Sequence, residues 1–332
     1  MGLLKAFSPT ARVAAFTPPA SPPAQRLLFA QHGMTDTNRT MAALARAIAS
    51  PHCLIVAPDL GYFKTLFSLE PLLQTVAQAA EQAWQAAPQQ PARIVATSLG
   101  GVIWVELLTR YPAWRSRIES LVLLGSPLGG ADLARMIDPL GWGLGIAKEL
   151  GKNRRPLAEA ITAVIPTLVV AGNVTGGGDR TVPLESTKLA HAHFVCLPGV
   201  SHPALRYHPA VIEAIRAFWA QPRQPLPPPA PTLLQALITH FRRVPGITDA
   251  SERDFPKAQA IITYPEGTSV RVWTNRLGVR HVFIADAANR CHYSGFVGWV
   301  HTAGLDRAVQ ACITQLPSQA LVPPQCRASG GG

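Results

Sequence analysis

The chain has 332 residues, enough for one large and one small domain, and 48% of them are hydrophobic while 15% are charged. This composition predicts a soluble, globular protein with a substantial core, and no run of 18 apolar residues predicts a membrane-spanning helix. The formal net charge is +11, yet no Lys/Arg run exceeds two residues. We interpret the charge as a general surface property that makes an anionic surface a candidate partner, and no nucleic acid is expected.

The amino-terminal segment carries no convincing targeting signal. The apolar stretch after Lys5 is too short for a signal peptide, and Ala6 departs from the myristoylation pattern. A cytoplasmic location is therefore the expectation.

The cysteines are few and include no C-x-x-C pair. Cys53 and Cys196 lie in apolar runs and are expected to be buried free thiols. A disulfide between Cys312 and Cys326 stays open as an alternative. Metal-ligand spacing is absent, so neither a metal nor another cofactor is expected.

Short apolar segments alternate with helical patterns between residues 26 and 220. Strands are expected at Arg26–Ala30, Cys53–Ala57, Ile94–Ala96, Ser120–Leu124, Thr167–Ala171 and Phe194–Leu197. Helices are expected with Met41, Leu44, Ala45 and Ile48 on one face, over 71–87, from Val102 onward, and over 207–219 with Val211, Ile215, Phe218 and Trp219 facing inward. Because the strands are apolar throughout, the pattern predicts a mostly parallel sheet with helices on both faces.

A serine stands at the corner between the third strand and its helix. The pattern around Ser98 is A-x-S-x-G, in which Ala96 replaces the first glycine of the usual G-x-S-x-G. Ala96 and Gly100 are small enough for a tight corner, and Gly101 allows close packing of helix on strand. This is the position at which a nucleophile is expected.

Two further groups follow later strands. Asp179 comes after the fifth strand and a run of three glycines, and His202 comes after the sixth. Because the carboxyl ends of parallel strands meet at one edge of the sheet, Ser98, Asp179 and His202 are expected to converge there. A histidine can remove the proton of a serine hydroxyl, and a carboxylate can orient the imidazole.

The order Ser, Asp, His and the flanking motifs resemble an α/β-hydrolase of the lipase and esterase branch over residues 26–220. The matching motifs are QHGM, IVAPDL, ATSLGG, LLGSPLGG, DRTVP and GVSHPAL. The resemblance implies that the backbone N–H groups of Met34 and Leu99 form the oxyanion hole. It also implies that the insert 127–166 is a lid over an acyl pocket, with ordinary helical packing as the alternative, and that the substrate is apolar.

Other residues compete for these roles. His208 is expected inside the final helix, which makes His202 the better base. His32 is expected to be structural in the oxyanion turn, and Asp59 is expected to anchor a loop.

The segment 221–231, QPRQPLPPPAP, predicts a linker after the hydrolase-like domain 1–220. Residues 232–316 predict a small α+β domain built on an antiparallel meander, and 317–332 predict a disordered tail. The helices are expected at 232–241 and 305–313, and the strands at 260–264, 269–274, 281–285 and 294–300. This part resembles no family that we recognise. Its strand aromatics are interpreted as core residues, with binding of a partner as the alternative: Tyr264, Trp273, Phe283, Tyr293, Phe296 and Trp299.

The first functional hypothesis is a serine hydrolase that cleaves carboxylic esters of hydrophobic, lipid-like acyl groups through an acyl-enzyme. Acyl transfer or thioester hydrolysis at the same site is the second. A non-catalytic binding or scaffold protein, with its function in the carboxyl-terminal domain, is the third.

Overall fold

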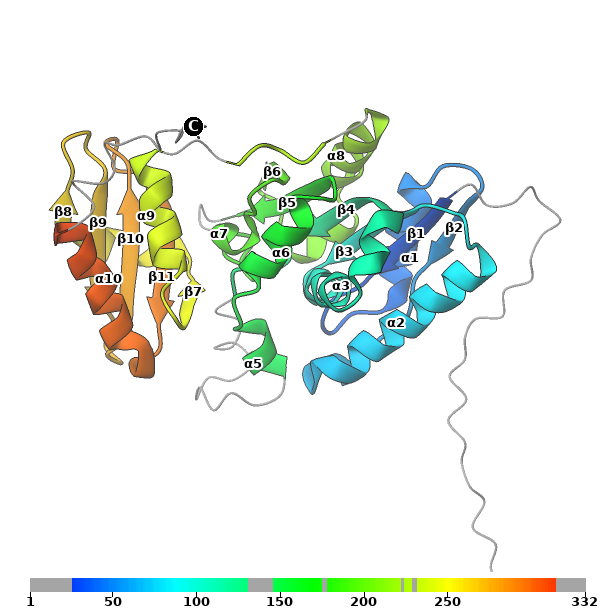
Figure 1. Ribbon diagram of the computed structural model, residues 1–332, viewed down its shortest axis with the longest axis horizontal. Coiled ribbons are helices and arrows are strands. Elements are labelled where there is room, and N and C mark those ends of the chain that lie inside the picture. Colours follow the sequence, from blue (N-terminus) through cyan, green and yellow to red (C-terminus); the bar gives the residue numbers. More distant parts are fainter. Residues whose placement is uncertain (1–25, 131–145, 175–177, 222–223, 229–231, 315–332) are drawn as a thin grey trace, which may run out of the picture.

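The structure is a computed structural model that describes residues 26–130, 146–174, 178–221, 224–228 and 232–314. Within these residues the chain forms two separate β-sheets, one from its first two thirds and one from its last third (Figure 1). The domain boundaries themselves stay predictions, because part of the proline-rich segment lies outside the described residues.

The larger sheet is parallel throughout. Its strand order is β2-β1-β3-β4-β5-β6, and every described pair of neighbours is parallel. The strands are β1 (Arg26–Gln31), β2 (Cys53–Val56), β3 (Ala92–Thr97), β4 (Ile118–Leu124), β5 (Thr167–Asn173) and β6 (His193–Pro198). A parallel sheet with this order and helices on both faces is the predicted α/β-hydrolase arrangement, so the fold-class prediction is confirmed.

Successive residues of the central strands point to opposite faces of this sheet, and both faces are covered. On one face, Leu28 and Val95 pack in a cluster with α1 (Asn38–Ile48) and α8 (Pro209–Ala220). On the other face, Leu27 and Ile94 pack in a cluster with α2 (Leu69–Ala86), α3 (Leu99–Arg110) and α6 (Arg155–Thr162). Burial on both faces explains why the central strands are apolar throughout.

The predicted burial is wrong for the two outer strands. β2 and β6 have one neighbour each, and most of their residues are half-buried. Cys53 and Cys196 lie in these strands, so both are half-buried free thiols rather than buried ones. Cys312 is buried and free, and Cys326 lies outside the described residues.

The smaller sheet is antiparallel, with strand order β7-β11-β10-β9-β8. Its strands are β7 (Ile247–Asp249), β8 (Gln259–Thr263), β9 (Ser269–Thr274), β10 (Arg280–Ala285) and β11 (Cys291–Val297). The helices α9 (Leu233–Arg242) and α10 (Thr302–Thr314) pack on one face, and a 3-10 helix (Glu252–Lys257) contributes to a second cluster with β10. The predicted meander corresponds to β8 through β11 in chain order.

Two details of the smaller sheet were mispredicted. β7 was missed because a strand of three residues is too short to show alternation. The last strand was expected over 294–300, but β11 ends at Val297, and Gly298 leads into a 3-10 helix that leaves Trp299 70% exposed.

The aromatic residues of this part divide between core and surface. Tyr264, Phe283 and Tyr293 are buried, as the core interpretation predicted. Trp273 and Phe296 are half-buried, and Trp299 is exposed, so the interpretation is wrong for Trp299.

Several predictions fall wholly or partly on residues outside the described ones. Residues 131–145 of the expected lid and the tail 317–332 belong to this group. The described remainder of the insert includes the short helix α5 (Ile146–Leu150) and α6. None of the helices in the described ranges combines the length and the apolar composition that a membrane span requires.

Candidate active site

Ser98 lies at the corner between β3 and α3. Its backbone has φ +53° and ψ −123°, a conformation that residues with a side chain rarely adopt. Ser98 N donates a hydrogen bond to the carbonyl of Leu124 (2.9 Å), and the Ser98 carbonyl accepts one from Gly101 N (3.0 Å). The corner is thus tied to the end of β4, while the Ser98 side chain stays half-buried.

The turn that follows β1 lies directly against this corner. A Cβ atom added to Gly33 would lie 2.9 Å from Ser98 Cβ and 3.4 Å from Leu99 N. A Cβ atom on Gly100 would lie 2.7 Å from the carbonyl oxygen of Gln31, so glycine is needed there as well. The structure therefore brings the turn containing Met34 next to Ser98 and the Leu99 amide, the two groups that sequence analysis linked to it.

His202 and Asp179 form a hydrogen-bonded pair. His202 Nδ1 and Asp179 Oδ2 are 2.6 Å apart, and His202 N also donates to the Asp179 carbonyl (3.1 Å). Because a carboxylate only accepts, Nδ1 is assigned as the donor of this hydrogen bond. The Asp179 carboxylate is 2% exposed. Its second oxygen accepts from the amides of Thr181 (3.0 Å) and Val182 (2.7 Å), which fixes its orientation.

The end of β4 lies between Ser98 and this pair. Leu124 accepts the hydrogen bond from Ser98, and the next residue, Gly125, has φ +55°. A Cβ atom on Gly125 would lie 3.0 Å from His202 Nδ1 and 3.1 Å from Asp179 Oδ2. Ser98 therefore contacts Leu124, and His202 and Asp179 lie beside the next residue, Gly125. Among the described residues, a hydrogen bond joins His202 to Asp179 but none joins Ser98 to His202.

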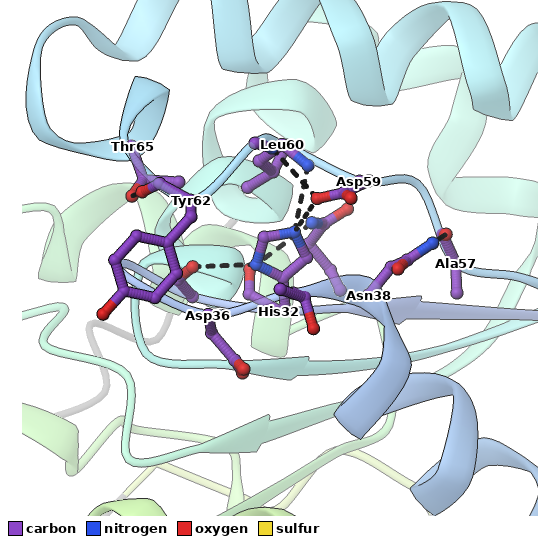
Figure 2. A network of polar contacts seen from close by, with 12 residues as sticks. His32, Asp36, Asn38, Ala57, Asp59, Leu60, Tyr62 and Thr65 are labelled. Carbon is purple, nitrogen blue, oxygen red and sulfur yellow. Dashed lines mark hydrogen bonds and ion pairs between the residues drawn. The ribbon is translucent and has the colours of Figure 1, made fainter. Parts of the chain in front are cut away.

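His32, in the turn after β1, is fully buried and takes part in the polar network that Figure 2 shows. Its Nε2 accepts a hydrogen bond from Leu60 N (3.0 Å), and its Nδ1 donates to the Gly33 carbonyl (2.9 Å). Both contacts require a neutral ring with the proton on Nδ1. Burial lowers the pKa of His32, although the nearby carboxylates of Asp36 and Asp59 partly oppose this. These contacts agree with the structural role expected for His32.

The two remaining candidates also make local structural contacts. Asp59 Oδ1 accepts from Gly61 N (3.0 Å) and lies 3.4 Å from His32 Nε2, as expected for a loop anchor. His208 was expected inside the last helix but is its N-cap, because Pro209 at the first helical position fixes the start; His208 Nδ1 accepts from Ala210 N (3.3 Å).

Sequence reasoning missed two supports of the site. Arg206, four residues after His202, forms an ion pair with Asp36 (2.5 Å) and so connects the segment after β6 to the segment after β1. The contact role of Gly125 was also missed, although the motif LLGSPLGG marked its position. Neither an ion pair between distant segments nor a close approach of backbone has a local sequence signal.

Two cavities lie away from Ser98, Asp179 and His202. One of about 470 Å³ is lined by Arg26, Arg93, Glu119 and Trp219 at the amino ends of the strands. No group of three or more His, Cys, Asp or Glu residues within the described ranges could hold a metal ion.

No protein-family model and no curated protein matches the chain. Among solved structures, Est1E from Butyrivibrio proteoclasticus is 18% identical, with 60% of this chain and 88% of that one covered and a TM-score of 0.46. The lipase BlEst2 from Bacillus licheniformis is 17% identical, with 60% and 96% covered and a TM-score of 0.43. A monoacylglycerol lipase from Paleococcus ferrophilus is 15% identical, with 59% and 96% covered and a TM-score of 0.40. Because these TM-scores lie below 0.5, the assignment of the fold rests on the strand order and helix arrangement described above.

Proposed function

We propose that this protein is a serine hydrolase that cleaves carboxylic esters through an acyl-enzyme. The observation that carries the proposal is the hydrogen-bonded pair of His202 and Asp179, which meets the strained Ser98 corner at the end of β4. A serine, a base and an orienting acid at one edge of a parallel sheet are the groups that acyl transfer requires.

In the proposed reaction, Ser98 Oγ attacks the carbonyl carbon of the ester and its proton passes to Nε2 of His202. Asp179 holds the imidazole in the required tautomer and stabilises the transient imidazolium. The negative charge on the tetrahedral intermediate is stabilised by the amides of Leu99 and Met34, each worth about 3 to 4 kcal/mol in sites of this type. His202 then returns the proton to the leaving alcohol, and a water molecule releases the acid by the same steps.

The preferred substrate is a small ester with an apolar, lipid-like acyl group. Three exposed aromatic side chains follow β2 at the same edge of the sheet: Tyr62, Phe63 and Phe67, exposed to 47%, 71% and 69%. Thr65 holds this segment to the turn after β1, because its hydroxyl accepts from Thr35 N (3.0 Å) and donates to the Tyr62 carbonyl (2.7 Å). An apolar surface fixed beside the site supports an apolar acyl group. The net charge of +11 keeps an anionic surface as a candidate contact.

The first experiment compares labelling by a fluorophosphonate probe in wild type, Ser98→Ala and His202→Ala. We expect labelling to be lost in Ser98→Ala and strongly reduced in His202→Ala, with turnover of p-nitrophenyl esters at least about 10⁴-fold lower in both. His208→Ala is the matched control, because His208 caps a helix beside the site, and its labelling should remain close to wild type.

A folded wild-type protein that neither labels nor hydrolyses any ester would contradict the proposal. Turnover of thioesters, or transfer to an added alcohol, that exceeds ester hydrolysis would favour the same site with a different acyl acceptor or donor.

A further inference from the structure

A buried ion pair joins a helix packed on the larger sheet to a strand of the smaller sheet. Arg155, the first residue of α6, contacts Asp249, the last residue of β7, across 94 positions of the chain. The two side chains are 4% and 2% exposed. Burial lowers the pKa of Arg155, but the carboxylates of Asp249, Glu159 and Glu185 together hold it above its usual value. Arg155 is therefore charged, and it depends on the Asp249 side chain beside it because an unpaired buried charge is strongly unfavourable.

Arg155 also binds the short helix α7 (Leu184–Thr187) and the residue that follows it. Its Nη2, which contacts Asp249, also donates to the carbonyl of Glu185 (2.8 Å), and its Nη1 donates to the carbonyl of Lys188. Arg242 of α9, from the same part of the chain as Asp249, adds an ion pair with the Glu185 carboxylate (3.3 Å). Two arginines thus hold α7: Arg242, which belongs to the smaller domain, and Arg155 of α6, which pairs with Asp249 of the smaller domain.

The helix α7 follows Asp179 by only five residues, and the intervening turn is built on the Asp179 carboxylate. Its oxygen Oδ1 accepts from the amides of Thr181 and Val182. Asp179 N also donates to the Val182 carbonyl (3.4 Å). A shift of α7 would therefore move the groups that orient this carboxylate.

The backbone of Asp249 also contacts the segment that follows β4. Asp249 N donates to the Gly129 carbonyl (3.4 Å), and Gly129 N donates to the Ser186 carbonyl (2.9 Å). Ser186 Oγ donates to the Gly130 carbonyl (2.6 Å). Asp249 therefore lies where the segments leading from Gly125 and from Asp179 meet.

We infer that the carboxyl-terminal domain is a positioning part of the candidate active site: through Arg155, Asp249 fixes α7 and so holds the Asp179 carboxylate against His202. The inference rests on the proposed function for its effect on turnover. The position of the carboxylate itself does not depend on that function. Arg155 and Asp249 are positioning residues, since neither is placed at the reacting atoms.

The test replaces Asp249 in the full-length protein and measures three quantities. Asp249→Asn removes one charge and leaves Arg155 buried without its partner. We expect kcat for a p-nitrophenyl ester to fall roughly 10- to 100-fold while KM changes little, because the acid is displaced and not the acyl pocket. The midpoint of thermal unfolding should also fall.

The third quantity is the proton NMR signal of His202 Nδ1–H, which its hydrogen bond to Asp179 shifts far downfield and which His202→Ala identifies. It should be present in wild type and lost or broadened in Asp249→Asn at a temperature where that variant is folded. Asp306→Asn is the control, because Asp306 pairs with Arg280 on the surface of the same domain at 47% exposure. It should retain the signal and kcat.

The double variant Arg155→Met/Asp249→Leu separates positioning from stability. Removing both buried charges should recover the unfolding midpoint, but the donors to the Glu185 and Lys188 carbonyls are gone, so kcat and the signal should not recover. Recovery of kcat and signal with the midpoint would overturn the inference, as would a folded Asp249→Asn with wild-type kcat and signal. If wild type shows the signal but no esterase activity, the proposed function fails while the positioning is still tested by the signal.

Discussion

At the scale of single residues, Gly125 leaves no space for a side chain beside His202 and Asp179. It has a φ of +55°, and an added Cβ would lie 2.7 Å from Leu205 Cδ1, 3.0 Å from His202 Nδ1 and 3.1 Å from Asp179 Oδ2. Gly125→Ala should cost about 1 to 2 kcal/mol of stability through φ. It should also lower kcat for ester hydrolysis by roughly 10- to 100-fold by displacing the pair.

The matched control for this prediction is Gly199→Ala. Gly199 has φ +75°, but an added Cβ would meet nothing within 4 Å. The Gly199→Ala variant should show only the loss of stability that comes from φ, measured by urea unfolding, and should keep its kcat. Equal kcat values in the two variants would show that the contact at Gly125 has no effect on the site.

His32 gives a second prediction at this scale, for the pH dependence of stability. Burial lowers its pKa in the folded protein below the ordinary value of about 6.5, so the unfolded chain binds a proton first as the pH falls. The free energy of unfolding should therefore decrease as the pH falls from about 6.5 towards the lowered pKa. His32→Gln, which can still accept from Leu60 N, should reduce this slope.

The measurement is the urea unfolding midpoint at a series of pH values. His52→Asn is the control, because His52 is exposed and its replacement disturbs no buried contact. A His32→Gln slope equal to that of wild type would contradict the prediction.

At the scale of elements, the segment after β2 carries the exposed aromatic residues. Its 3-10 helix, Lys64–Leu66, leaves Phe63 and Phe67 on either side. If the acyl chain packs there, Phe63→Ser/Phe67→Ser should lower kcat/KM for p-nitrophenyl decanoate by roughly 10- to 100-fold through lost apolar contact. The value for p-nitrophenyl acetate should change little.

Val164→Ser is the control for the aromatic segment. Val164 is 60% exposed and lies shortly before β5 begins, at the opposite edge of the sheet. Val164→Ser should leave kcat/KM unchanged for both p-nitrophenyl decanoate and p-nitrophenyl acetate. An equal loss for decanoate and acetate in the aromatic variant would indicate a disturbed site rather than a lost acyl contact.

At the scale of the whole molecule, the buried Arg155–Asp249 pair couples the two sheets. Separating them would leave two charges without partners, so wild type should unfold in one calorimetric transition. In Asp249→Asn, where the coupling is weakened, two transitions should appear, and the first should have a midpoint below that of wild type. Two resolved transitions in wild type would show that the domains are thermodynamically independent.

The sequence predicted a mostly parallel sheet, the positions of its strands along the chain and the candidate site residues. Strands buried on both faces carry continuous apolar runs, and the corner at Ser98 requires small neighbouring residues. Both features can therefore be recognised in a few consecutive residues. The same locality explains the errors: the three residues of β7 are too few to show alternation, and the exposure of β2 and β6 depends on their place at the ends of the sheet.

Only the tertiary structure decided which distant groups meet. Three contacts join segments that lie far apart in the chain, and no sequence pattern marks them. They are the ion pair of Arg155 with Asp249, the ion pair of Arg206 with Asp36, and the close approach of Gly125 to His202. A charged or glycine residue has the same local signal whether it faces solvent or a partner across the fold. Its role appears only when burial removes water and leaves that partner as the remaining source of stabilisation.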